Sequence, residues 1–269
     1  MDVRSLAYRT DLIVRERSGS IVTDQGDHLV VRTPAIPNFW WGNFILVAGP
    51  PGPGDATRWR ALFTREFPTA DHCAIGVDGV DGEPGPAAEL AELDLLARIS
   101  TVMRASSLTP PARPAPEAVV VRPLADDADW RAAGELRVTV AREHGEGSAG
   151  HRNFLARQMA ASRTMSDDGH AWWFGAFEDG ALRSCLGIVT DGHGLARYQA
   201  VETHPEHRRR GLAGTLVHAA GEHAIAHAGA STLVIVAEPD GPADGLYRSL
   251  GFADAERQVE LNGRWMRDE

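Results

Sequence analysis

The spacing of apolar and polar residues predicts both strands and helices, most clearly in the last third of the sequence. Residues 232–237 (TLVIVA) form a continuous apolar run, which is typical of a strand in the middle of a sheet. Residues 211–227 instead place their apolar side chains on one helical face, and Gly229 follows as a helix stop. A helix that leads into a buried strand indicates an α/β fold.

The same kind of pattern extends over the rest of the second half. It predicts a hairpin around the turn Glu178–Gly180 and a further strand that leads into the helix at residue 211. Asp126 or Asp127 is placed to cap a helix that runs to about Arg142. The other predicted helices cover residues 153–165 and 243–250, and the predicted strands cover residues 118–122, 171–177, 186–191, 195–203, 232–237 and 252–261.

The first half repeats part of this order at a nearly constant offset. Gly54 corresponds to Gly211 as the start of a helix, and His72 corresponds to Thr232 as the start of a strand. We interpret this as a weak internal duplication, with chance as the alternative, because strand, loop, helix and strand often follow one another. The repeated elements are a strand at 44–47, a Gly/Pro loop at 49–54, a helix at 56–67, a strand at 72–77 and a largely helical stretch at 87–96.

A proline-rich segment at residues 105–117 separates the two halves. Four prolines make a helix or a central strand impossible there, and they favour an extended chain. We therefore predict domains at residues 1–104 and 118–269 joined by this linker. A mobile surface loop is the alternative interpretation.

Composition excludes several classes of chemistry. The 269 residues carry a net charge of −10, and all 27 basic residues are arginines. Without lysine there is no Schiff-base chemistry, no pyridoxal phosphate attachment and no P-loop lysine. The acidic balance argues against a nucleic-acid partner and mildly favours a cationic substrate.

The cysteines and the apolar runs give an expectation about the compartment. Cys73 and Cys185 lie far apart, so a disulfide is not expected and the compartment is expected to be reducing. The N-terminal residues show no apolar leader, and no run approaches the length of a membrane span. We predict a cytoplasmic protein with no membrane partner.

The run from Arg208 to Gly214 (RRRGLAG) carries the strongest chemical signal. It follows a predicted strand and opens a predicted helix. Backbone amides exposed at the start of a helix, next to fixed positive charge, bind phosphate groups. Glycine and alanine in this run let the backbone approach a bulky diphosphate.

Two motifs resemble those of the GCN5-related N-acetyltransferases. Residues 201–213 (VETHPEHRRRGLA) are similar to motif A of that family, Gln/Arg-x-x-Gly-x-Gly/Ala after a strand, with Arg208, Gly211 and Ala213 at the defined positions. Residues 246–252 (LYRSLGF) resemble the second signature, Leu-Tyr-x-x-Leu-Gly-Phe at the end of a short helix. The resemblance covers residues 118–269, whereas residues 1–104 hold no acceptable copy of either motif.

This resemblance implies an α/β (α+β) fold in which a mixed, splayed sheet is flanked by helices. It also implies two such domains in tandem, with a degenerate N-terminal copy. Acetyl-CoA would be the co-substrate, with its diphosphate on the amides from Arg209 to Gly214 and its pantetheine arm paired with the strand at Val201 and Thr203. The residues expected to bind it are Val201, Thr203, Arg208, Arg209, Arg210, Gly211, Leu212, Ala213, Gly214 and Thr215.

The resemblance further implies two catalytic residues. Tyr247 is expected to protonate the departing thiolate, and unperturbed pKa values of ~10 and ~8.5 make that transfer uphill by about 2 kcal/mol. Glu202 is expected to act as the base, directly or through water. A packed core aromatic and an exposed strand carboxylate are the respective alternatives, and His204 is a rival base.

The expected activity is transfer of an acetyl group to a primary amine of a small molecule or peptide, by direct attack in a ternary complex. A non-catalytic acyl-CoA sensor or interaction module is the alternative, as is transfer of another acyl group or transfer to a hydroxyl. No metal is expected, because His223 and His227 have a ligand-like spacing but no third partner in the sequence. The sequence leaves open a homodimer.

Overall fold

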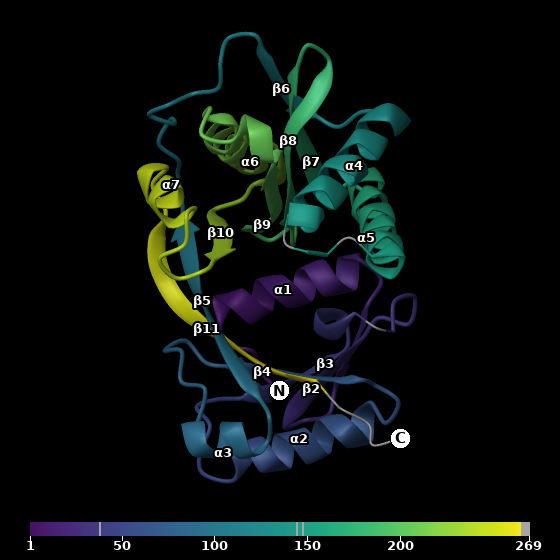
Figure 1. The fold of residues 1–269 in the computed structure, drawn as a ribbon. Coiled ribbons are helices and arrows are strands. Elements are labelled where there is room, and N and C mark those ends of the chain that lie inside the picture. The colour runs from purple at the N-terminus through teal and green to yellow at the C-terminus, as the bar shows by residue number, and fades with distance from the viewer. Residues whose placement is uncertain (38, 144, 147, 265–269) are drawn as a thin grey trace. The chain divides into compact units, whose positions relative to one another are not determined.

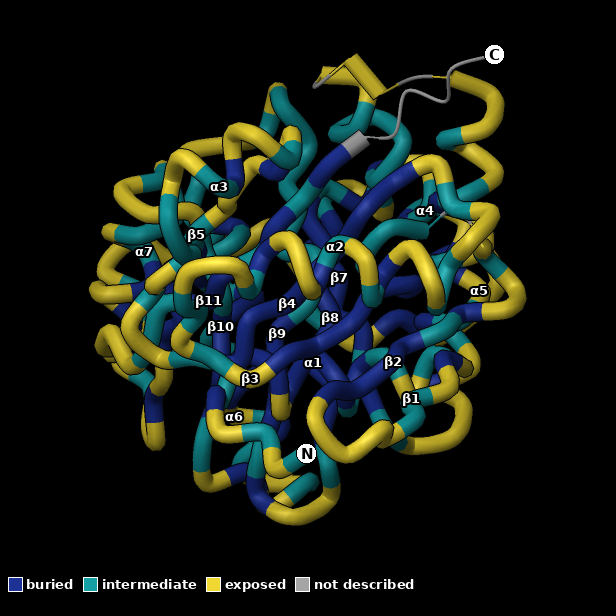
Figure 2. The backbone as a smooth tube through the Cα atoms, turned by 90° about the horizontal axis from the view of Figure 1, so that it is seen from below, coloured by how far each residue is buried: buried dark blue, intermediate teal, exposed yellow. Residues whose placement is uncertain are grey.

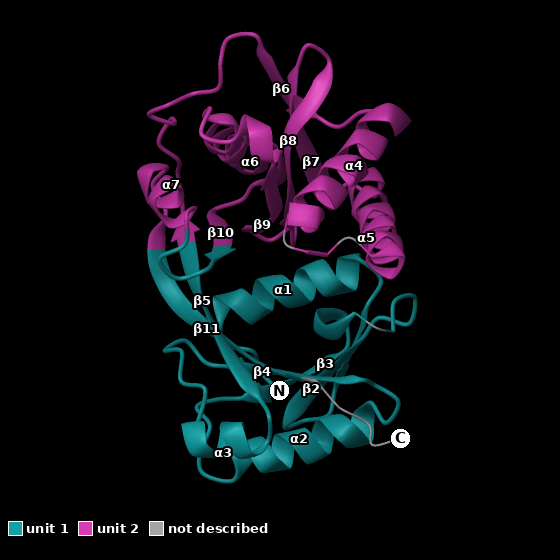
Figure 3. Ribbon diagram, viewed as in Figure 1, with its two compact units in different colours: residues 1–103, 236–241, 254–269 teal, residues 104–235, 242–253 magenta. Residues whose placement is uncertain are grey.

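The computed structural model of the chain describes residues 1–264 with the exception of residues 38, 144 and 147 (Figure 1). The chain divides into two compact units (Figure 3). Unit 1 comprises residues 1–103, 236–241 and 254–269, and unit 2 comprises residues 104–235 and 242–253. The proline-rich segment 105–117 therefore lies within unit 2, and the C-terminal strand clusters with unit 1.

Unit 1 is a sheet flanked by helices. Its strands follow the order β1-β2-β3-β4-β11-β5, with β3 and β4 parallel and β4 and β11 antiparallel. The helices are α1 (Leu6–Arg17), α2 (Asp55–Glu66) and α3 (Ala87–Glu92), with a 3₁₀ turn at Trp40–Gly42, and the strands are β1 (Ile21–Asp24), β2 (His28–Arg32), β3 (Phe44–Ala48), β4 (His72–Asp78), β5 (Leu96–Ala105) and β11 (Ala253–Arg264).

The core of unit 1 forms around α1, β3 and β4, whose strand residues are almost all buried (Figure 2). Tyr8 of α1 is fully buried and its hydroxyl donates a hydrogen bond to the carbonyl oxygen of Val259. A Cβ on Gly76 would lie 2.8 Å from the Tyr8 ring, so only glycine fits at this position of β4. Burial of this ring removes a large apolar area from water, which is the main source of stability in such a core.

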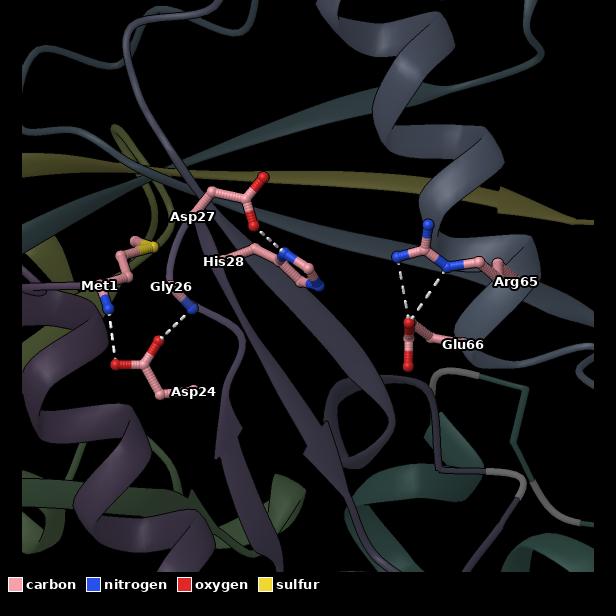
Figure 4. Close-up of polar contacts among 7 residues, drawn as sticks. All are labelled: Met1, Asp24, Gly26, Asp27, His28, Arg65 and Glu66. Carbon is pink, nitrogen blue, oxygen red and sulfur yellow. Dashed lines mark hydrogen bonds and ion pairs between the residues drawn. The ribbon is translucent and has the colours of Figure 1, made fainter.

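Polar contacts fix the edges of unit 1 (Figure 4). The Asp24 carboxylate accepts hydrogen bonds from the N-terminal amine at 2.6 Å and from the amide of Gly26 at 2.7 Å. The second bond shapes the turn between β1 and β2, in the way that aspartate side chains commonly do. The Asp27 carboxylate and the His28 ring lie 2.6 Å apart on the same hairpin.

Unit 2 is a mixed sheet in the order β10-β9-β8-β7-β6, with β10 and β9 parallel and the other pairs antiparallel. The mixed, splayed sheet with flanking helices confirms the α/β fold predicted from the sequence. The helices are α4 (Asp127–Glu143), α5 (Ala149–Asp167), α6 (Leu212–Ala228) and α7 (Asp244–Ser249), with a 3₁₀ turn at Pro205–His207, and the strands are β6 (Val119–Pro123), β7 (Ala171–Glu178), β8 (Ala181–Thr190), β9 (Leu195–Thr203) and β10 (Thr232–Ala237).

Helices cover both faces of the unit 2 sheet. On β7 the Trp173 ring packs against Trp130 of α4, while Trp172 and Phe174 contact His223 of α6. Successive side chains of a strand point to opposite faces. Therefore α4 and α6 lie on opposite faces, as Figure 1 shows.

Two predicted elements have clearly different bounds in the structure. The strand predicted at residues 186–191 is β8, which already begins at Ala181. The helical stretch predicted over residues 87–96 ends at Glu92, and Leu96 already begins strand β5. Asp94, between them, has a φ of +52°, which ends the helix and turns the chain into the strand. The apolar residues of the helix and the strand follow one another without a glycine or proline between them, and for this reason the sequence pattern does not separate the two.

Candidate functional site

The strands β9 and β10 pair over a short length and then separate. Their parallel register runs only from Thr232↔Leu195 to Val234↔Arg197, although β9 continues to Thr203. On the other side, the β8–β9 register shifts between Cys185 and Gly187, and Ala200 has a φ of +47°. A β-bulge of this kind bends the strand. Beyond Arg197, no strand of the described residues pairs with the edge of β9 that faces β10.

The free edge of β9 presents Val201 and Thr203. The amide of His204 bonds to β8, and the carbonyl of Glu202 accepts a bond from Ser184 of β8 at 2.7 Å. Backbone groups of alternate residues point to opposite neighbours along a strand. The backbone groups of Val201 and Thr203 therefore face away from β8. The Thr203 carbonyl already accepts a bond from the Nε atom of Arg208 at 3.4 Å, and an extended ligand could pair with the remaining groups.

The loop that follows β9 forms a cradle of backbone amides. Arg209 has a φ of +60° and Gly211, the N-cap of α6, has a φ of +81°. The first amide that bonds back is that of Thr215, to the carbonyl of Gly211 at 3.0 Å. The amides from 209 to 214 donate to none of the residues that the structure describes. Such unbonded donors at a helix start, with left-handed residues between them, fit a diphosphate.

The three arginines of this loop differ in their partners. Arg208 forms a bidentate pair with Glu143 at the end of α4, and Arg210 forms one with Glu178 at the end of β7. Arg210 holds the pKa of the Glu178 carboxyl below its usual range. Arg209 is exposed, and among described residues its side chain has no ion pair. The guanidinium groups of Arg208 and Arg210 are thus already bound to carboxylates.

The first turn of α6 is tightly packed. Leu212 is buried, and a Cβ on Gly214 would lie 3.1 Å from Leu246 of α7. The Thr215 hydroxyl donates to the carbonyl of Gly211 at 3.1 Å and accepts a bond from the amide of Ala115 at 2.8 Å. Leu212 and Gly214 are both buried, so this packing fixes the backbone of the turn.

Tyr247, the expected acid, lies on α7 with its ring almost fully buried. Its exposure is 5%, its ring contacts Phe252, and burial raises the pKa of its hydroxyl to about 12. The hydroxyl makes no hydrogen bond to a described residue. A neutral phenol is thus held in the unit that contains the cradle, and its role as acid stays a prediction.

Glu202, the expected base, lies on the α4 side of β9. Burial raises the pKa of its carboxyl, and Arg137 of α4 opposes that shift. The Nε atom of Arg137 lies 3.8 Å from a Glu202 carboxylate oxygen, and the guanidinium also donates to Gln158 at 3.0 Å. A carboxyl with a raised pKa is the more basic once ionised, which suits the role that remains predicted for it.

The corresponding helix start in unit 1, at α2, binds a carboxylate of the protein itself. Gly54, the N-cap of α2, has a φ of +85° and ψ of −9°, nearly the same as the +81° and −3° of Gly211. Here the Glu89 carboxylate accepts bonds from the amides of Gly54 and Thr57, each at 2.9 Å. The N-cap amide and the amide three residues later therefore form an anion seat, and the corresponding donors in unit 2 are Gly211 and Gly214.

The parallel strands of unit 1, β3 and β4, do not separate as β9 and β10 do. The parallel pairs of β3 and β4 run to Ala48↔Asp78, and the amide of Gly49 continues the ladder to the Asp78 carbonyl at 3.1 Å. The Asp78 carboxylate is itself bonded to the amides of Arg4 and Ser5. The open strand edge and the unfilled anion seat thus occur together in unit 2 alone among the described residues.

Comparison with solved structures identifies the fold. A GCN5-related N-acetyltransferase from Kribbella flavida is similar over 96% of this chain and 96% of its own, with a TM-score of 0.66 and 17% identity. A tandem GNAT protein from the clavulanic acid biosynthesis pathway covers 98% of this chain and 89% of its own, with a TM-score of 0.57 and 18% identity. The chain has the fold of the GCN5-related N-acetyltransferases.

The sequence comparison agrees with that fold. Residues 175–261 match the family model described as FR47-like protein, a range that includes the cradle and α7. A functionally unknown conserved protein from Staphylococcus epidermidis is also similar in structure, with a TM-score of 0.69, 11% identity, and coverage of 90% of this chain and 92% of its own. No curated protein matches the sequence. The resemblance of the two motifs to GCN5-related N-acetyltransferases is confirmed at the level of fold.

The described residues lack two other features, a metal-binding cluster and a membrane-spanning helix. None of these residues forms a group of three or more histidine, cysteine, aspartate or glutamate side chains that could hold a metal ion. No helix in the described part of the chain has the length and apolarity to cross a membrane. The rings of His223 and His227 stack on each other 4.2 Å apart.

Sequence reasoning missed the residues that bind the arginines and Glu202. Glu143, Glu178 and Arg137 lie on α4 and β7, far along the chain from the motif they contact. Their sequence neighbourhoods are ordinary helix and strand ends, so no local signal could have found them. The contact between Ala115 and Thr215 was missed for the same reason.

Proposed function

We propose that the protein is an acetyl-CoA-dependent N-acetyltransferase of a primary amine, with its site in unit 2. The observation that carries this proposal is the combination of a free β9 edge with unbonded amides at the start of α6. The GCN5-related fold supports the same assignment. Unit 1 would be a degenerate copy, because Glu89 fills its anion seat and its strands do not separate.

The residues present fit acetyl-CoA. The amides of Gly211 and Gly214 would hold the diphosphate, and the backbone of Val201 and Thr203 would pair with the pantetheine arm. Each amide bond to a charged oxygen is stronger than a neutral one, so several together give both affinity and orientation. Bound acetyl-CoA would supply an acetyl group activated as a thioester.

Glu202 and Tyr247 would transfer the protons of the reaction. The acceptor arrives as an ammonium ion and must lose one proton before its nitrogen can attack the acetyl carbon. Glu202 accepts that proton, directly or through water. As the bond between carbon and sulfur breaks, the Tyr247 hydroxyl would donate a proton to the departing sulfur. The second proton that the nitrogen loses on becoming an amide would return to the tyrosinate oxygen. The acidic balance of the chain, −10, mildly favours approach of a cationic acceptor.

A screen of primary amines with acetyl-CoA, reading the release of free thiol, tests this function. We expect release with a subset of amines and none without an acceptor. A matching series of alcohols and of longer acyl-CoA molecules distinguishes the related acyltransferases. Tight binding of CoA without thiol release for any acceptor would instead identify a non-catalytic acyl-CoA sensor.

A further inference from the structure

The proline-rich segment is a docked part of unit 2. We call residues 107–115 the strap, because they run along α6 from its middle to its start. Leu108 lies 2.4 Å from a Cβ placed on Gly221, and Pro111 lies 3.5 Å from one placed on Gly214. The amide of Thr109 also bonds to the carbonyl of Leu250 at 2.9 Å.

The strap ends against the coenzyme cradle. A Cβ on Gly211 would lie 2.5 Å from the carbonyl oxygens of both Arg113 and Pro114. The next amide, of Ala115, bonds to the Thr215 hydroxyl at 2.8 Å. Because proline fixes φ, the prolines of the strap hold it extended, and this bond fixes its register along the helix.

The strap leaves the anion seat open. In unit 1, Glu89 occupies the seat on the amide of Gly54, yet a Cβ on Gly54 would have no atom within 4 Å. An anion on such an amide therefore lies on a different side of the glycine from its Cβ direction. Since Gly211 has nearly the same backbone angles, the strap carbonyls lie beside the seat and do not fill it.

Arg113 of the strap is a cation that lies beside the start of α6. Its side chain is exposed, and no described residue forms an ion pair with it. Its backbone oxygen lies 2.5 Å from a Cβ placed on Gly211, so the Cα of Arg113 lies within the length of an arginine side chain from the Gly211 amide. Arg208 and Arg210 are already bound to Glu143 and Glu178. The cations that remain at the cradle are thus Arg209 and Arg113.

Coenzyme A presents one more phosphate than the cradle accounts for. Its diphosphate joins the pantetheine arm to an adenosine that carries a 3′-phosphate. With the arm along β9 and the diphosphate on the amides, the adenosine and its 3′-phosphate would follow the diphosphate at the start of α6, on the side away from the arm. We propose that Arg113 binds this 3′-phosphate and makes the site selective for CoA over 3′-dephospho-CoA. This inference rests on the proposed function.

Titration calorimetry with CoA and with 3′-dephospho-CoA tests the inference on the full chain. We expect the wild type to bind CoA about tenfold more tightly, the effect of one charge-assisted contact near the surface. Arg113→Gln should bring the two affinities within about twofold, and Arg113→Lys should restore part of the difference. Arg131→Gln, an equally exposed change on α4, should leave the ratio as in the wild type.

The outcomes separate this inference from the function on which it rests. A wild type that binds both ligands, with an unchanged ratio in Arg113→Gln, overturns the role of Arg113 and leaves the function standing. Equal weakening of both ligands by Arg113→Gln also overturns the 3′-phosphate assignment, since dephospho-CoA lacks that group. A wild type that binds neither ligand overturns the proposed function and this inference with it.

Discussion

The carboxylate of Glu89 accepts a hydrogen bond from the amide of Gly54 at 2.9 Å, and so fills in unit 1 the seat that lies open on Gly211 in unit 2. A fixed negative charge from the protein itself competes with any phosphate at that helix start. The two helix starts share their backbone angles but differ in occupant. This difference predicts that only one of them takes up a coenzyme.

The first prediction concerns stoichiometry. Titration of the full chain with CoA should give one bound molecule, and Glu89→Ala should still give one. Removal of the Glu89 carboxylate should not let a second CoA molecule bind, because the bond between the Gly49 amide and the Asp78 carbonyl keeps β3 and β4 together. Two molecules bound to the wild type would contradict the assignment of unit 1 as a degenerate copy.

Glu89 also has a predictable effect on stability. Hydrogen bonds from the amides of Thr57 and Gly54 lower the pKa of its carboxyl. A carboxyl with a folded-state pKa below its unfolded value adds stability above that unfolded value, and the added stability is lost as the pH falls through the folded pKa. Glu89→Gln should therefore unfold at a lower denaturant concentration than the wild type at pH 7. The difference should shrink below about pH 4; a constant difference would show that the charge does not matter.

The elements around the cradle could be predicted from the sequence because each has a local signal. The apolar run of 232–237 and the helical spacing after Gly211 match β10 and α6 closely. Gly211 itself marks a left-handed N-cap, which few other residues adopt without strain. These local signals, together with the two motifs, were enough to indicate the fold.

Other elements lack such signals. Helix α1 buries Thr10 and Asp11 along with its apolar residues, so the residues of its buried face do not form an apolar stripe in the sequence. The pairs that fix the site, such as Arg208 with Glu143, join residues far apart in the sequence. Contacts of this kind follow from the tertiary fold, and no periodicity along the chain reports them. The hairpin of β1 and β2, in contrast, has a turn with Gly26 that a closer reading of the pattern could have found.

A third prediction concerns the acid. Tyr247→Phe should lower kcat about a hundredfold, with little change in the KM for acetyl-CoA, because the hydroxyl acts in the chemical step. With a pKa of about 12, the hydroxyl of Tyr247 stays protonated through pH 10, so the wild-type rate should show no loss from tyrosine ionisation in that range. Steady-state kinetics and a pH profile check both points. An unchanged kcat in Tyr247→Phe would leave this residue with only the packing role of a core aromatic.

A fourth prediction concerns the partner of the base. Burial raises the pKa of Glu202, and Arg137 lowers it. Arg137→Met removes the lowering influence, so the pKa of Glu202 should rise further. The acidic limb of the profile of kcat/KM against pH should then move to higher pH, since more alkaline conditions are needed to ionise the base.

The control for this prediction is Glu202→Gln, which should remove the acidic limb together with most of the activity. Arg163→Met offers a matched change of another α4-contacting arginine, since Arg163 of α5 pairs with Asp127 and not with Glu202. It should leave the limb in place. A limb that stays fixed in Arg137→Met, or one that Arg163→Met moves equally, would assign the base to a residue other than Glu202.

The last prediction compares two glycines with the same backbone and different surroundings. Gly54→Ala forces a left-handed conformation on alanine, at a φ of +85°, but meets no atom within 4 Å. It should cost about 1 to 2 kcal/mol of unfolding free energy, the ordinary penalty of that conformation. Gly211→Ala carries the same penalty at a φ of +81°, and its Cβ would also lie 2.5 Å from the carbonyls of Arg113 and Pro114. The strap must then move, so the loss should exceed that of Gly54→Ala by at least about 1 kcal/mol. Urea denaturation of the two variants measures the difference, and limited proteolysis within residues 107–115 should become faster in Gly211→Ala alone. Equal losses with unchanged proteolysis would mean that the strap does not press on the cradle, and the place of Arg113 in the site would lose its structural support.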